Sequence, residues 1–113
     1  MNTEDFDKII EDRIDKIRKV LSVKAKEYVE SGDRLGNFKR AGELIDETPI
    51  KALLGFCAKH IVALYDFANR NTNEVSYGQW EEKLGDIINY MILLDGLLNE
   101  EIQYDLKVKE VTE

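Results

Sequence analysis

Apolar side chains recur every three or four residues along most of the chain, which is the period of an amphipathic α-helix. The first apolar stripe ends shortly before the pair Ser31–Gly32, which is typical of a helix C-terminus. Its members are Phe6, Ile10, Ile14, Ile17, Leu21, Ala25 and Tyr28. Because the chain also contains a single proline, the pattern predicts an all-α fold, a helical bundle of three long helices plus a short one.

The second and third long helices are expected to begin at capping sequences. Thr48 can cap a helix that opens with Pro49 and continues through PIKALLGFCAKHIVALYDFA, which is apolar enough to be buried. Ser76 and Gln79 have the spacing of a capping box in front of the last helix. Before Thr48, the sequence DRLGNFKRAGELID predicts a loop or turn that leads into the short helix. The polar sequence NRNTNE predicts a turn between the two later helices.

The last long helix is expected to bury one apolar face. That face consists of Trp80, Leu84, Ile87, Met91, Leu94 and Leu98. Beyond it, the sequence YDLKVKEVTE is rich in charge. We therefore predict a single helical domain over residues 1–104 and a charged, flexible tail over residues 105–113.

Composition and charge narrow the possible functions. The chain has 113 residues and a net charge of -7, so we expect one domain that does not bind nucleic acid or an anionic membrane non-specifically. We also expect no membrane-spanning helix, because every apolar run is short. The acidic N-terminal sequence has no signal-peptide core. The lone Cys57 excludes an internal disulfide and a zinc cluster, so we expect a cytoplasmic protein.

Glu82, Asp86 and Asn89 are separated by four and three residues, so they share one face of the last helix. This face lies opposite the predicted apolar stripe. Two carboxylates one turn apart can bind a hard cation such as Mg²⁺, and an amide oxygen can add a further ligand. The alternative is an ordinary solvated surface, where carboxylate pairs at this spacing are common.

A basic group in an otherwise acidic chain lies between the first two long helices. It consists of Arg34, Lys39 and Arg40, together with Asn37 and Phe38. Positive charge near a carboxylate cluster suits an anionic, metal-dependent ligand such as a nucleotide phosphate, which arginine can bind through its planar fork. Phe38 or Tyr28 could stack on a base. The alternative is that these cations balance nearby acids at a solvated helix start.

The helix that follows Pro49 adds Lys59 and the only histidine, His60. A single histidine in an apolar helix is either a hydrogen-bonded core residue or a ligand-binding group, and the sequence leaves both open. Cys57 falls within an apolar stripe and is most simply a small core residue.

Three blocks of sequence occur in the order of a known family: AKEYVESGDRLGNF (25–38), CAKHIVALYDF (57–67) and EEKLGDIINYMILL (81–94). The first resembles a Lys-x-x-Tyr-Gly-x-x-x-Phe region, and the second resembles a helix that carries a polar pair. The third resembles an acid-x-x-x-Asp-x-x-Asn-Tyr helix, read here as Glu82, Asp86, Asn89 and Tyr90. Over residues 24–98 the chain therefore resembles the MazG-like all-α nucleotide pyrophosphatase superfamily, and more closely its phage-associated branch of nucleotide modification associated domains.

This resemblance implies a helical bundle that assembles as a dimer or tetramer, so a homo-oligomer is expected. It also implies that acidic residues bind Mg²⁺, which holds a nucleoside triphosphate while water releases pyrophosphate. Glu82 and Asp86 would be the catalytic metal ligands. Contacts to the nucleotide or a related phosphate ligand are expected from Arg34, Asn37, Phe38, Lys39, Lys59, His60, Asn89 and Tyr90.

The sequence also departs from the family pattern. Lys83 stands where the family usually has an acid. The remaining acidic pair could be Glu27 and Glu30 or Glu43 and Asp46, and the sequence does not choose between them. Three functions stay open: a Mg²⁺-dependent nucleotide pyrophosphohydrolase, a non-catalytic protein that sequesters a nucleotide signal or a host protein, and a purely structural oligomer whose first helix is the assembly seam.

Overall fold

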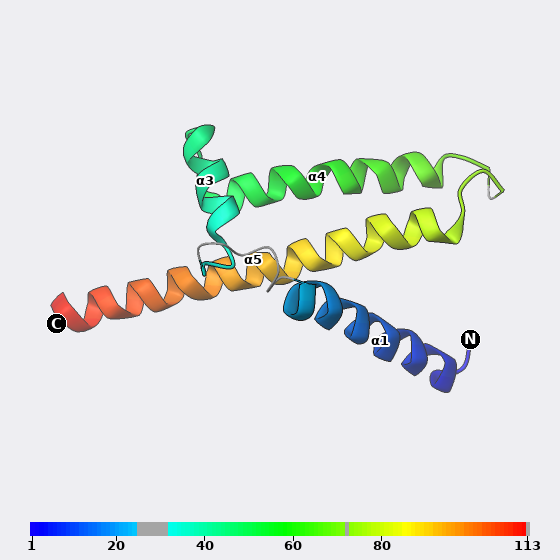
Figure 1. The fold of residues 1–113 in the computed structure, drawn as a ribbon, viewed down its shortest axis with the longest axis horizontal. Coiled ribbons are helices and arrows are strands. Elements are labelled where there is room, and N and C mark those ends of the chain that lie inside the picture. Colours follow the sequence, from blue (N-terminus) through cyan, green and yellow to red (C-terminus); the bar gives the residue numbers. More distant parts are fainter. Residues whose placement is uncertain (25–31, 72, 113) are drawn as a thin grey trace. The chain divides into compact units, whose positions relative to one another are not determined.

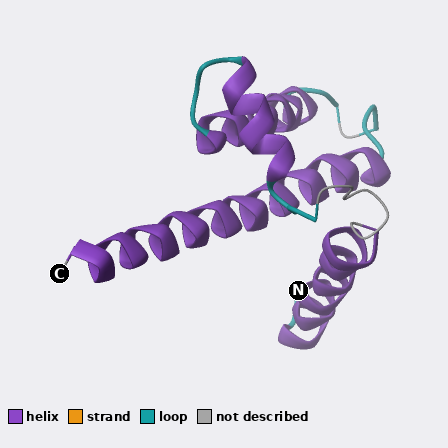
Figure 2. Cartoon of the chain, turned by 60° about the vertical axis from the view of Figure 1, so that its left-hand side comes forward, coloured by secondary structure: helices purple, strands orange, loops and turns teal. Residues whose placement is uncertain are grey.

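The computed structural model of the protein describes residues 1–24, 32–71 and 73–112. Their order is α1 (Thr3–Arg18), the π-helix η1 (Lys19–Lys24), α3 (Gly36–Leu44), α4 (Pro49–Ala68) and α5 (Tyr77–Thr112). These residues form helices and turns without a strand (Figure 2), so the predicted all-α class is confirmed for the described part of the chain. None of the helices found there combines the length and the apolar character needed to cross a membrane.

Internal contacts divide the chain into two units, Met1–Arg34 and Leu35–Glu113. The first contains α1 and η1, and the second contains α3, α4 and α5. The predicted boundary at residue 104 falls inside α5, which stays helical to Thr112. The predicted flexibility of residues 105–113 is a statement about motion, which the helix bounds do not address, so it stays a prediction.

The first unit contains the predicted amphipathic helix, but its backbone changes after Arg18. Helix α1 is capped by Asn2, whose side chain accepts a hydrogen bond of 2.8 Å from the Asp5 amide. The helix continues as η1 instead of as an α-helix, and the wider π-helical turns change the spacing of the apolar stripe there. Ser31 of the predicted helix end, like Tyr28, lies outside the described residues, while Gly32 has the positive φ of 75° that glycine favours.

The second unit confirms both predicted capping sequences. Thr48 Oγ1 accepts a hydrogen bond of 3.2 Å from the Lys51 amide, and Pro49 lies in the first turn of α4. At the start of α5, the Ser76 amide donates to Gln79 Oε1 over 2.9 Å, and the Gln79 amide donates to Ser76 Oγ over 3.2 Å. The predicted short helix is α3, so the elements of this unit follow from local sequence signals.

Helices α4 and α5 run antiparallel, and α3 packs against α4 near its first turns (Figure 1). The core of this unit is small and centres on Leu35, Leu53 and Leu97. Partly buried side chains surround it, namely Phe38, Ile50, Tyr90, Leu93 and Leu94. Helix α4 was expected to be buried, but only Ala52, Leu53 and Cys57 are fully buried in it.

The predicted buried face of α5 is confirmed only in part, because Trp80, Ile87 and Leu94 are partly buried while the other three residues of that face are not. Leu84, Met91 and Leu98 remain exposed. The side of α5 that meets α4 carries Asp86 and Tyr90, which both contact His60. Because α5 is apolar around much of its circumference, its sequence does not single out one face, and packing against α4 selects one that overlaps the predicted face only in part.

Candidate functional site

His60 of α4 and Asp86 and Tyr90 of α5 form a polar layer where the two helices pack. His60 Nδ1 lies 3.6 Å from Asp86 Oδ2, and the His60 and Tyr90 ring centroids are 5.5 Å apart. Asp86 and Tyr90 are four residues apart, so they project from the same side of α5. On either side of this polar layer the helix contact is apolar, with Leu53 and Leu97 toward one end. Phe67 and Trp80 stack edge to face at 5.4 Å toward the other.

One ring nitrogen of His60 in the polar layer lacks a hydrogen bond. Its Nδ1 atom is buried and has no hydrogen-bond partner among the described residues. The 3.6 Å separation from Asp86 is within ion-pair range but too long for a hydrogen bond. A buried polar atom left unpaired costs about 1–3 kcal/mol. The Asp86 side chain is 44% exposed, so a molecule from solvent can reach its carboxylate.

An aromatic side chain from α3 lies beside the polar layer. The Phe38 ring is 6.3 Å from the Tyr90 ring and 6.2 Å from the Phe56 ring. Burial raises the pKa of the Tyr90 phenol, and the nearby Asp86 carboxylate and Cys57 thiolate raise it further. Cys57 is buried, as predicted for a core residue, and burial raises the pKa of its thiol. The Tyr90 hydroxyl therefore remains protonated at neutral pH.

Glu82 and Asn89 lie along the α3 side of the same helix. Glu82, Asn89 and Gly96 are spaced by seven residues, so they share a face. Gly96 faces Leu35, because a Cβ at this glycine would be 3.5 Å from Leu35 Cδ1. Glu82 is exposed and Asn89 is half-buried. The predicted triad is thus placed at the edge of the α4–α5 contact, with Asp86 turned toward His60.

The carboxylates of Glu82 and Asp86 fit the usual protein contribution to a Mg²⁺ site, which is one or two carboxylates completed by water and phosphate oxygens. Within residues 1–24, 32–71 and 73–112, no three His, Cys, Asp or Glu side chains gather closely enough to hold a metal by themselves. Of the candidates for a second acidic pair, Glu27 and Glu30 lie outside the described residues. Glu43 and Asp46 are exposed at the end of α3 that points away from α5 (Figure 1).

The predicted basic residues are placed in different parts of the structure. Lys39 Nζ pairs with Glu100 Oε2 at 2.9 Å, and Glu100 is fourteen residues beyond Asp86, or about 21 Å along α5. Arg34 belongs to the first unit, where it donates to the Leu21 carbonyl over 3.5 Å.

The remaining predicted contacts lie near α3 and α4. Asn37 Oδ1 accepts a 3.0 Å hydrogen bond from Arg40. Lys59 is next to His60 in sequence and is exposed. It lines a hollow of about 250 Å³ between α3 and α4 together with Ala52 and Phe56. Lys59 is therefore the predicted cation that lies on the same helix turn as the polar layer.

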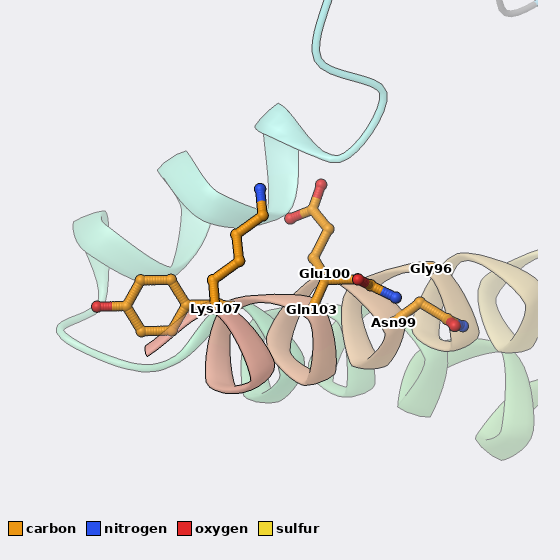
Figure 3. Close-up of a pocket in the computed structure, with 6 residues that line it drawn as sticks. Gly96, Asn99, Glu100, Gln103 and Lys107 are labelled. Atoms are coloured by element: carbon orange, nitrogen blue, oxygen red, sulfur yellow. The ribbon is translucent and has the colours of Figure 1, made fainter. Parts of the chain in front are cut away.

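A second hollow, of about 490 Å³, lies on the C-terminal half of α5, where no sequence motif indicated a site. It is lined by Gly96, Asn99, Glu100, Gln103, Tyr104 and Lys107. Glu100 and Lys107 rise from the same side of the helix (Figure 3). Gly96 begins about 15 Å along α5 from Asp86, so this hollow is separate from the polar layer.

Comparison of the chain with protein-family models, with curated proteins and with solved structures gives no match. The resemblance to the MazG-like superfamily therefore stays a prediction that rests on the three sequence blocks.

Proposed function

We propose that the protein binds a nucleotide or a related phosphate compound beside the polar layer, with Mg²⁺ held by Glu82 and Asp86. The observation that carries this proposal is the meeting of an exposed carboxylate, Asp86, with the unpaired buried Nδ1 of His60. Buried polar atoms normally have a hydrogen-bond partner. A ligand, or a water molecule bound with it, that hydrogen-bonds to His60 Nδ1 and Asp86 would therefore be stabilised here.

The neighbouring side chains suit the parts of a nucleotide. A Mg²⁺ ion on the two carboxylates would neutralise phosphate charge, and the exposed Lys59 adds a cation next to His60. Phe38 beside Tyr90 offers aromatic surface for a base. The Asn89 amide can donate to an oxygen and accept from an amine or hydroxyl.

Two activities are compatible with this binding step. In a pyrophosphohydrolase, the residues of the polar layer would position the triphosphate and water, since metal-assisted phosphoryl chemistry depends mainly on positioning and charge neutralisation. In a sequestering protein, the same contacts would hold a nucleotide signal without cleaving it. The alternative is that the protein sequesters a host protein, and in that case no nucleotide would bind.

The test is calorimetric binding of a nucleoside triphosphate panel with and without Mg²⁺, while pyrophosphate release is followed. Loss of a residue that only supports a metal ligand already weakens metal binding roughly tenfold. Asp86→Asn removes a proposed ligand itself, so it is expected to weaken Mg²⁺-dependent binding by more than this. The matched control is Asp66→Asn on α4. The Asp66 carboxylate pairs with Arg70 over 2.7 Å and is not part of the polar layer. This control should bind like the unmodified chain.

A second variant separates a binding role for His60 from a packing role. His60→Leu removes the unpaired nitrogen, so the fold should be no less stable while nucleotide affinity falls. Binding without pyrophosphate release identifies a sequestering protein. If no nucleotide produces heat while circular dichroism shows a folded chain, the proposed function is wrong.

A further inference from the structure

The hollow between α3 and α4 combines an apolar interior with positive charge, and we call it the α3–α4 hollow. It measures about 250 Å³. Its largest apolar side chains are Ile45, which follows α3, and Phe56 of α4, and they are 61% and 41% exposed. Lys51 and Lys59 of α4 also line it, eight residues or about 12 Å apart along the helix. Within the described part of the chain, no acidic side chain lines this hollow.

Gly55 lies midway between the two lysines and also lines the α3–α4 hollow. A glycine inside a helix lowers its stability relative to alanine, so it needs a reason. Gly42 and Gly96 have a packing reason, because a Cβ there would lie 2.7 Å from the Glu47 carbonyl oxygen and 3.5 Å from Leu35, respectively. A Cβ at Gly55 would meet no side chain or neighbouring element within 4 Å. Glycine at this position therefore keeps the hollow open and relieves no contact within the protein.

The two lysines of the hollow differ in how far their charge is balanced. Lys51 Nζ lies 3.2 Å from Glu47 Oε2. Lys59 is exposed and has no ion-pair partner among the residues that the structure describes. Its ammonium group is a compact charge with three donors, which suits a carboxylate. An unpaired lysine beside an apolar hollow favours a ligand that carries one negative charge and an apolar body.

We propose that the α3–α4 hollow binds a small amphipathic carboxylate, with one carboxylate group on an unbranched apolar chain. The carboxylate pairs with Lys59, and the chain lies over Gly55 between Ile45 and Phe56. Ligand sites typically have an apolar lining with a few polar groups that fix the orientation of the ligand, as this hollow has. Its volume is below the roughly 300–1,000 Å³ of sites for drug-sized molecules, so the chain is short.

This inference goes beyond the proposed function and does not depend on it. The hollow lies between α3 and α4, whereas His60 turns toward α5, where it contacts Asp86 and Tyr90. Lys59 borders both places. The two proposals are therefore separated by a ligand without phosphate, by buffer without Mg²⁺, and by a variant at Gly55.

The test is an NMR titration of the full chain with unbranched carboxylates from butanoate to octanoate, in the absence of Mg²⁺ and nucleotide. The methyl signals of Ala41, Ile45 and Ala52, which line the hollow, should shift. The indole signal of Trp80, which stacks on Phe67 near the other end of α4, should not. Burial of the chain should raise the affinity about fourfold for each added methylene.

A variant that fills the hollow tests the location of the chain. Gly55→Leu should weaken octanoate binding more than tenfold, because several methylenes at about fourfold each lose their place. The added side chain enters open space, so circular dichroism should show an unchanged helix content. The matched control is Ala68→Leu, which enlarges an exposed residue of α4 outside the hollow. It should bind octanoate like the unmodified chain.

A second variant tests the charge of the ligand. Lys59→Gln should lower the affinity for octanoate by up to about fivefold, as expected for an exposed ion pair, and should leave that for octanol unchanged. Lys8→Gln removes an exposed lysine of α1 and should change neither. The proposal is wrong if the three methyl signals stay in place, or if Gly55→Leu binds octanoate as tightly as the unmodified chain. Equal affinities of the unmodified chain for octanoate and octanol would overturn the assignment of a carboxylate.

Discussion

Burial at the contact of α4 with α5 keeps the Cys57 thiol and the Tyr90 phenol protonated to a higher pH than usual. The pKa of the Cys57 thiol is raised by burial. The pKa of the Tyr90 phenol is raised mainly by burial, and to a smaller extent by the Asp86 carboxylate and the Cys57 thiolate. The folded state binds both protons more tightly than the unfolded state, so their stabilising effect is complete below the ordinary pKa values of about 8.5 for cysteine and 10 for tyrosine. It is lost as the pH rises through the raised values.

We therefore predict that the free energy of unfolding falls in two stages on the alkaline side, first through Cys57 and then through Tyr90. Between the ordinary pKa of a group and its raised pKa in the folded state, only the unfolded state has lost the proton. In this pH range the free energy of unfolding falls by about 1.4 kcal/mol per pH unit. Urea unfolding at successive pH values measures this dependence. Tyr90→Phe should abolish the second stage, whereas Tyr104→Phe, which removes an exposed phenol, should retain it. Equal slopes in the two variants would contradict the assignment to Tyr90.

Residue spacing predicted part of the candidate site and missed the rest for a physical reason. The four- and three-residue steps from Glu82 to Asn89 are local, so they correctly placed these side chains within two turns of one helix. The contact of Asp86 with His60 depends on the register between α4 and α5, which no short motif encodes. Lys39 was expected near the acids but pairs with Glu100, and this pairing depends on how α3 packs against the helix pair, which the local sequence does not encode.

At the scale of elements, two glycines should respond to alanine in opposite directions. Gly42 of α3 is buried, and a Cβ there would approach the Glu47 carbonyl oxygen to 2.7 Å and backbone atoms of Thr48 and Pro49 to 3.1 and 3.2 Å. Backbone cannot move aside as a flexible side chain does, so Gly42→Ala should destabilise the protein by about 1–3 kcal/mol. In the middle of α4, a Cβ added to Gly55 would meet no side chain or neighbouring element within 4 Å.

Gly55→Ala should therefore stabilise the protein by about 0.5–1 kcal/mol, because alanine has the higher helix propensity. Thermal unfolding of both variants at one protein concentration checks the pair. The substitutions are chemically identical, so each serves as the control for the other. A stable Gly42→Ala variant would show that the turn after α3 is looser than its contacts indicate.

Helix starts could be predicted from the sequence, but helix faces could not. The Lys51 amide donates to Thr48, and Ser76 and Gln79 bond to each other, so each capping bond spans three residues and the signal is as local as the structure. Leu84 and Met91 were expected to be buried, yet α5 turns Asp86 and Tyr90 to α4 instead. The change from α1 to a π-helix after Arg18 also had no sequence signal that we could identify.

At the scale of the whole molecule, the division into two units predicts where the chain can be cut. Helix α1 has no buried residue, whereas Leu35, Leu53 and Leu97 of the core all belong to the second unit. Tolerance to truncation depends on the burial that is lost. Removal of residues 1–34 leaves all three of these core residues in the chain, so we expect the core of the second unit to stay intact.

We predict that a chain of residues 35–113 unfolds cooperatively and loses less than about 1 kcal/mol, which for a domain of this size corresponds to a fall in Tm of at most about 4–8 °C. Thermal unfolding beside the full chain, at equal protein concentration, measures the difference. Leu97→Ala within the fragment is the control, because it removes a core side chain that is 3% exposed and should cost about 2–5 kcal/mol. A fragment that melts without a cooperative transition would mean that residues 1–34 supply part of the core, and the second unit would then not be an independent folding unit.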